Sequence, residues 1–91
     1  MKFTKKDKNF LFSLGYTERD LPQIEEATHS TKTKYNLDGK PIGREEAIQL
    51  LGRQKYLTGI SRSAFHWSAA RMTDDGRTVM FDSSRLFSGR G

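Results

Sequence analysis

The stretch REEAIQLLGRQKYLTGISRSAFHW, residues 44–67, carries apolar residues at helical spacing through most of its length. Its first part predicts a helix over 44–51, with two acids in the first turn, where the helix dipole favours them. Gly52 is expected to end this helix. A second helix is predicted over 53–65, although Gly59 inside it costs about 1 kcal/mol relative to alanine. The apolar residues of the pair are Ala47, Leu50, Leu51, Leu57, Ile60 and Ala64.

From Phe65 onward the apolar period changes from helical spacing to alternation, which is typical of a half-buried strand. A second alternating run ends at Phe81, and Asp75-Gly76 between the two runs is a strong turn signal. The sequence therefore predicts a C-terminal antiparallel β-hairpin. Alternation places Trp67, the lone tryptophan, in the core, and leaves His66 exposed.

Residues before this stretch predict mainly helix. Thr4 can cap a helix over 5–14, Asp20 can start a second one, and Asp38-Gly39 predicts a turn within a short extended segment. The expected fold is a small single α+β domain of about four helices with a C-terminal antiparallel β-hairpin, compact over 1–88 and followed by a flexible tail over 89–91.

Length and composition set the class of protein. A chain of 91 residues forms one core, and its ten aromatic residues argue against disorder. It contains no cysteine, so neither a disulfide framework nor a thiolate zinc site is available. No run of 18 apolar residues and no signal-peptide pattern is present. We therefore expect a cytoplasmic protein with no membrane partner; the oligomeric state is left open.

The charge pattern points to a polyanionic partner. The net charge is +5, and no Asp or Glu occurs between Ala47 and Thr73, although four basic residues do. Lys and Arg attract phosphates and release their counterions. The sequence thus predicts a small non-catalytic protein that contacts the backbone of DNA or RNA through a basic face.

Residues 44–65 resemble a helix-turn-helix in the spacing of their small and apolar contacts, and the following hairpin resembles the wing of winged helix-turn-helix domains, which extends the likeness to residues 44–82. The turn glycine of that family would fall at Leu51, whereas here it is Gly52. The resemblance implies a winged-helix-like fold in which the second helix faces the major groove or its phosphates. The competing interpretation is two amphipathic helices that pack together and expose a polar side.

The residues expected to contact nucleic acid are the polar and basic ones of the second helix and the hairpin strands. They are Arg53, Gln54, Lys55, Thr58, Arg62, His66, Arg71 and Arg77. Asp74 and Asp75 at the hairpin tip would repel phosphates. They therefore favour either simple turn chemistry or contact with a protein partner.

The general type, a compact basic domain without cysteine, is similar to small accessory proteins of bacteriophages and other mobile elements. These include regulators that bind nucleic acid and inhibitors of host defence complexes such as CRISPR effectors. The alternative prediction is therefore a protein-binding inhibitor or adaptor that contacts a host protein or ribonucleoprotein through Asp74 and Asp75.

Catalytic chemistry has little support in the sequence. His29 and His66 are the two histidines, and no His pair with Asp or Glu has metal-ligand spacing. We expect no catalytic residues, no metal and no cofactor. A small basic ribonuclease, in which His66 transfers a proton between Arg62 and Arg71, is a minor alternative.

Overall fold

The computed structural model describes residues 2–87 and shows helices packed against an antiparallel sheet. Its elements in chain order are α1 (Lys5–Ser13), the 3-10 turn η1 (Glu18–Asp20), α2 (Leu21–His29), β1 (Lys34–Leu37), β2 (Lys40–Ile42), α3 (Arg44–Leu51), α4 (Arg53–His66), β3 (Ser68–Met72), β4 (Thr78–Asp82) and α5 (Ser84–Phe87). The predicted α+β class is confirmed. The predicted C-terminal antiparallel hairpin is present as β3 and β4. The prediction of about four helices is wrong, because residues 2–87 contain five α-helices, and the hairpin is part of a four-stranded sheet. The predicted tail over 89–91 lies outside the described residues.

The sheet is antiparallel, with strand order β2-β1-β4-β3. Strands β1 and β2 form a hairpin around Asp38 and Gly39, which both adopt positive φ as a tight two-residue turn requires. The first strand then pairs with β4, so that Tyr35 lies opposite Phe81. The strands are therefore not confined to the C-terminal part of the chain. No local pattern reports this pairing, because it joins segments more than 40 positions apart.

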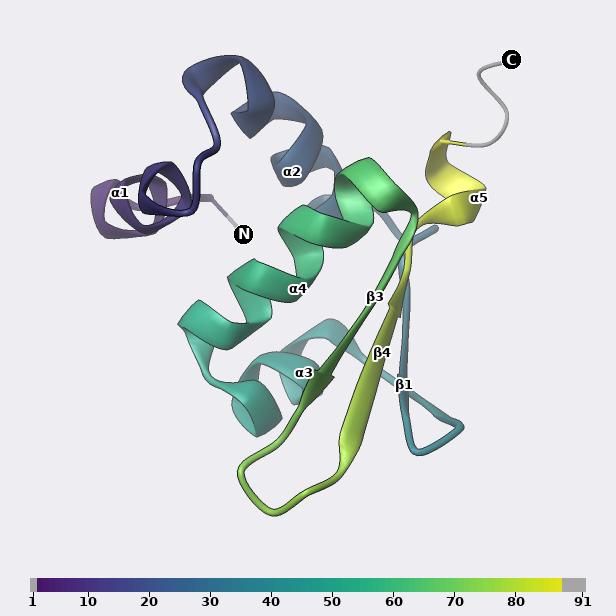
Figure 1. The fold of residues 1–91 in the computed structure, drawn as a ribbon. Helices are drawn as coiled ribbons and strands as arrows, with labels where there is room; N and C mark the ends of the chain where they lie inside the picture. The colour runs from purple at the N-terminus through teal and green to yellow at the C-terminus, as the bar shows by residue number, and fades with distance from the viewer. Residues whose placement is uncertain (1, 88–91) are drawn as a thin grey trace.

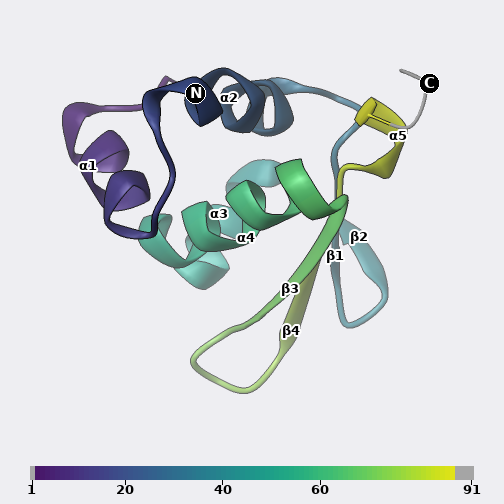
Figure 2. The same ribbon diagram turned by 45° about the horizontal axis from the view of Figure 1, so that its top comes forward.

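The two faces of the sheet have different environments. Helices α1 to α4 lie on one side of it, with α4 leading directly into β3 (Figure 1), and Figure 2 shows the opposite side free of these helices. Side chains that point toward α4, including Val79 and Phe81, are buried, whereas their neighbours Met80 and Asp82 are exposed. The sheet thus has one covered face and one open face.

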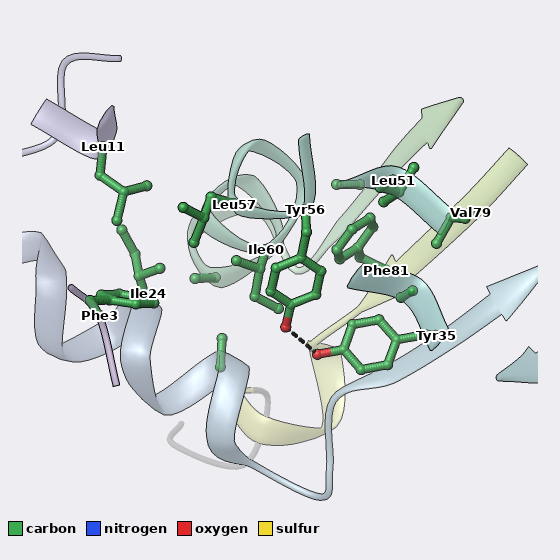
Figure 3. Close-up of a cluster of buried hydrophobic side chains, with 14 of the residues drawn as sticks. Phe3, Leu11, Ile24, Tyr35, Leu51, Tyr56, Leu57, Ile60, Val79 and Phe81 are labelled. Atoms are coloured by element: carbon green, nitrogen blue, oxygen red, sulfur yellow. Dashed lines mark hydrogen bonds between the residues drawn. The ribbon is translucent and has the colours of Figure 1, made fainter. Parts of the chain in front are cut away.

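The core is built around α4. Its buried side chains Tyr56, Leu57 and Ile60 meet Leu11 of α1, Ile24 of α2 and the covered face of the sheet (Figure 3). Inside this core, the Tyr56 hydroxyl lies 2.7 Å from the Thr28 hydroxyl and 2.8 Å from that of Tyr35. Burial raises the pKa of both tyrosines. The three hydroxyls satisfy one another where water has no access.

The helix predictions hold here with one correction, at the end of α1. A reciprocal capping box starts α1: the Thr4 hydroxyl accepts from the Asp7 N–H, and the Asp7 carboxylate accepts from the Thr4 N–H. Leu14, the last residue of the predicted helix over 5–14, is 46% exposed because the helix ends at Ser13. At the other end of the chain, Asp82 caps α5 by accepting from the N–H and hydroxyl of Ser84. Within residues 2–87 there is no helix long and apolar enough to cross a membrane.

Candidate nucleic-acid interface

One side of α4 faces solvent. Five of the predicted contact residues lie on it at helical spacing and are exposed or half-buried: Gln54, Lys55, Thr58, Arg62 and His66. The opposite sides of the helix are committed to the core and contact α1, α2, α3 and the sheet. We call these five residues the α4 stripe. Their shared exposure follows from the 3.6-residue period, which the sequence predicted correctly for this helix.

Arg53 points away from the stripe, toward α1. Its Nε and Nη2 atoms donate to Oδ1 and Oδ2 of Asp7 at 2.8 and 2.7 Å. The Asp7 side chain is only 4% exposed, whereas that of Arg53 is 43% exposed. The hydrogen bonds from Arg53 hold the pKa of Asp7 below its usual value. This bidentate pair fastens α1 to the start of α4, so much of the Arg53 charge is compensated within the protein.

Lys55 and Arg71 are partly engaged in covering the edge of the sheet. The Thr73 N–H donates to the Arg77 carbonyl, so Thr73 is hydrogen-bonded to the neighbouring strand segment. Because hydrogen-bonded residues alternate along an antiparallel strand, the backbone N–H and C=O groups of Ala70 and Met72 point away from β4. Arg71 donates to the Ala70 carbonyl at 2.7 Å, and Lys55 Nζ donates to the Met72 carbonyl at 2.8 Å. Basic side chains that cap an edge strand discourage pairing with another chain.

Arg71 also joins the strand to the α4 stripe. Its Nε donates to the Thr58 hydroxyl at 2.9 Å, and its Nη2 donates to the Thr58 carbonyl at 3.2 Å. The structure therefore brings Lys55, Thr58 and Arg71 together. Arg62, one turn further along α4, is exposed and forms no ion pair within residues 2–87.

The predicted tip residues have different environments. Asp75 accepts from the Thr73 hydroxyl and from Arg77 Nε at 3.1 Å, and these bonds lower the pKa of its carboxyl. It therefore organises the turn and compensates Arg77, as turn chemistry predicts. Asp74 is fully exposed, with its Oδ1 atom 3.4 Å from Lys55 Nζ. Asp74 and Asp7 both lie outside the segment from Ala47 to Thr73, and they pair with Lys55 and Arg53 of that segment.

The prediction that Trp67 is buried is wrong, since the residue is 54% exposed. Helix α4 continues to His66, and Trp67 ends it in the left-handed conformation with φ of 71°. A residue with a Cβ pays about 1–2 kcal/mol for this conformation, which glycine usually adopts at helix ends. Helical spacing from Ile60 and alternation from Phe65 both place position 67 inward, so neither period could reveal its exposure.

Trp67 stands beside the open face of the sheet. Strand register aligns Ala70, Met80, Asn36 and Pro41 in one row across all four strands of this face. Met80 is 44% exposed, and Met72 at the edge is 59% exposed. Next to Trp67 the surface is hollowed by about 590 Å³, with walls that include Asn36, His66, Ser68, Met80, Asp82 and Ser84.

Arg71, which the ribonuclease alternative would use beside His66, is bonded to α4. Its Nε and Nη2 atoms donate to Thr58, and Asp82 accepts from Ser84. Ser83, a residue that could be considered as a nucleophile, is fully buried and bonded to the Ser63 hydroxyl. Within the part of the chain that the structure describes, no three metal-ligating side chains cluster.

Comparison with known proteins gives no relative for this arrangement: no family model, no curated protein and no solved structure matches the chain.

Proposed function

We propose that this protein binds nucleic acid without catalysing a reaction, and that the α4 stripe is its contact surface. One observation carries the proposal. The α4 stripe presents Lys55, Arg62 and His66 to solvent, and Trp67, the residue that follows His66, is exposed as well. Cations together with an exposed aromatic ring are the combination that proteins use to hold a phosphate backbone and its bases.

Fewer basic side chains of this surface can contact a phosphate than the net charge of the chain implies. Arg53 and Arg77 have carboxylate partners, and Lys55 shares Asp74, so Arg62 is the cation best placed to contact a phosphate. The length from Lys55 to His66 along α4 is roughly 16 Å. This supports a few phosphate contacts and hence moderate affinity with a modest salt dependence. In the winged helix-turn-helix form of the proposal, α3 and α4 are the helix pair and the β3–β4 hairpin is the wing.

Fluorescence anisotropy with labelled single- and double-stranded DNA and RNA, measured from low to physiological salt, tests the proposal. Arg62→Ala should weaken binding and reduce the slope of log K against log salt by about 0.7–0.9, the value for one lost phosphate contact. Lys32→Ala removes the same charge from an exposed loop and is the matched control. Failure of all four nucleic acids to bind at low salt would refute the proposal.

A protein partner is the second candidate, and the open face of the sheet favours it. Trp67, Met72 and Met80 expose large apolar surface there, and such residues are frequent at protein interfaces. An inhibitor of a host defence complex would use this face together with the exposed Asp74. Its complex should withstand salt that dissociates a phosphate-driven one, and Met72→Asp should disrupt it.

A further inference from the structure

Trp67 combines an unusual backbone conformation with an exposed side chain. A bulky residue at positive φ is unusual, and strained residues of this kind collect at functional sites. Its indole is 54% exposed, although it is the sole tryptophan of the chain. Its backbone is held on both sides, because the N–H donates to the Ser63 carbonyl at 2.7 Å and the carbonyl accepts from the Ser83 N–H at 2.8 Å. The ring is therefore presented outward from a fixed backbone.

The hollow beside Trp67 combines an aromatic wall with hydrogen-bonding groups. Its volume of about 590 Å³ lies in the range of pockets that hold small ligands. Met80 supplies a second apolar surface, Asn36 an amide, and Ser68 and Ser84 hydroxyls. An apolar face with polar groups at its margin matches a flat heteroaromatic ring.

The charge of Asp82 determines which part of a nucleotide the hollow can hold. The hydrogen bonds from Ser84 lower the pKa of the Asp82 carboxyl, so this side chain is an anion at neutral pH. It repels a phosphate, but it can accept hydrogen bonds from the amino groups of bases. Cations lie instead on α4, where Arg62 precedes His66 by one helical turn. The hollow thus suits a base, and the helix beside it suits the phosphates.

We infer that the hollow takes an unpaired nucleobase stacked on the Trp67 indole, so that the protein prefers single-stranded nucleic acid to a duplex. This inference rests on the proposed function and makes it more specific. In a duplex each base is stacked between its neighbours and cannot reach the indole unless it is flipped out.

Because Trp67 is the sole tryptophan, the fluorescence of the protein reports on this site. The wild-type protein is titrated with a ten-nucleotide single strand of mixed sequence and with the corresponding duplex, and both anisotropy and tryptophan fluorescence are followed. Base stacking on Trp67 should quench its fluorescence, with the same midpoint as the anisotropy curve. The single strand should bind more tightly than the duplex.

Substitutions of Trp67 separate stacking from charge. Trp67→Ala should weaken single-strand binding roughly 5- to 150-fold, the range expected for one lost stacking contact. Trp67→Phe should retain most of the affinity, because a ring still presents a π-face. Met72→Ala is the matched control: it removes another exposed apolar side chain from the same face, outside the walls of the hollow. Circular dichroism checks that each variant is folded.

The outcomes distinguish this inference from the proposed function. Absence of nucleic-acid binding removes both. Salt-dependent binding with unchanged tryptophan fluorescence, or equal affinity for the duplex, overturns the inference and leaves the proposed function standing. Should Trp67→Ala fail to fold, the fluorescence titration of the wild type still decides. Wild-type affinity in a folded Trp67→Ala protein would also overturn the inference, and the apolar face would then be assigned to a protein partner.

Discussion

Phe81 of β4 packs directly against the backbone of Gly59 in α4. A Cβ atom built on Gly59 would lie less than 3.0 Å from the Phe81 ring. Glycine in the middle of a helix normally lowers stability. Here its missing side chain lets the helix approach the sheet closely enough for Phe81 to be fully buried.

Gly59→Ala should therefore destabilise the protein, although alanine is the better helix former. Alanine raises the helix propensity by about 1 kcal/mol, but overpacking against Phe81 costs about 1–3 kcal/mol. The packing cost therefore outweighs the gain when it lies in the upper part of its range. Urea unfolding followed by circular dichroism measures the change. Gln54→Ala, an exposed position of the same helix, is the control and should change stability by less than about 0.5 kcal/mol. A stabilised Gly59→Ala protein would contradict this packing.

The Asp7–Arg53 pair should make α1 dependent on a single buried carboxylate. Asp7→Asn is expected to lower the free energy of unfolding by about 1.5–3 kcal/mol, because hydrogen bonds to charged groups are lost. Asp20→Asn is a matched control, since Asp20 caps η1 through the Thr17 N–H at 2.8 Å but is only half-buried and has no Arg partner within residues 2–87. That variant should cost about 1 kcal/mol or less.

The same pair predicts how stability depends on pH. Because the pKa of Asp7 is lowered in the folded protein, its contribution is complete above the ordinary value of 3.8 and is lost as the pH falls below it. The difference in stability between the wild type and Asp7→Asn should therefore be constant from pH 7 to 5 and should shrink toward pH 3. Thermal unfolding of both proteins across this range measures it. A difference that persists at low pH would show that the charge of Asp7 is not the cause.

The hydroxyl chain in the core should respond unequally to loss of its members. Tyr56→Phe removes the central hydroxyl and leaves those of Thr28 and Tyr35 without this partner, which costs about 1–3 kcal/mol. Tyr35→Phe removes only the end of the chain and should cost less. Denaturant unfolding of both single variants and of the double variant checks the order, and the two effects should not add, because the residues share one bond.

The left-handed backbone at Trp67 can be tested apart from any ligand. Trp67→Gly and Trp67→Ala both remove the indole, but only glycine adopts positive φ without strain. The glycine variant should be more stable than the alanine variant by about 1 kcal/mol in urea unfolding. The reverse order would mean that position 67 is not left-handed in solution.

Local patterns were sufficient for most of the helices and for the cap at Thr4. Ala47 and Leu51 for α3, and Leu57, Ile60 and Ala64 for α4, recur at the helical period because each helix buries one side. The exposed positions of α4 followed from the same period, so most of the candidate surface was predictable. Turns were predictable too, since Asp38-Gly39 and Asp75-Gly76 have the backbone freedom that hairpins require.

Pairing between distant segments was not predictable in this way. The sheet forms because β1 inserts beside β4, and the energy of that contact depends on both strands rather than on either one. The same applies to charge. The segment from Ala47 to Thr73 contains no acid, yet Asp7 and Asp74 come from outside it and neutralise part of its basic surface.

The exposure of Trp67 shows most clearly which features depend on tertiary contacts and escape local patterns. Composition identified one tryptophan, and both local periods placed it inside. Its actual position depends on where α4 ends, and the bonds of its backbone to Ser63 and Ser83 hold it there. The amino-acid sequence alone thus specified the class of fold, the helices and the exposed side of α4, because those depend on near neighbours. The neutralised cations, the open sheet face and the outward indole arose from contacts between segments far apart in the chain.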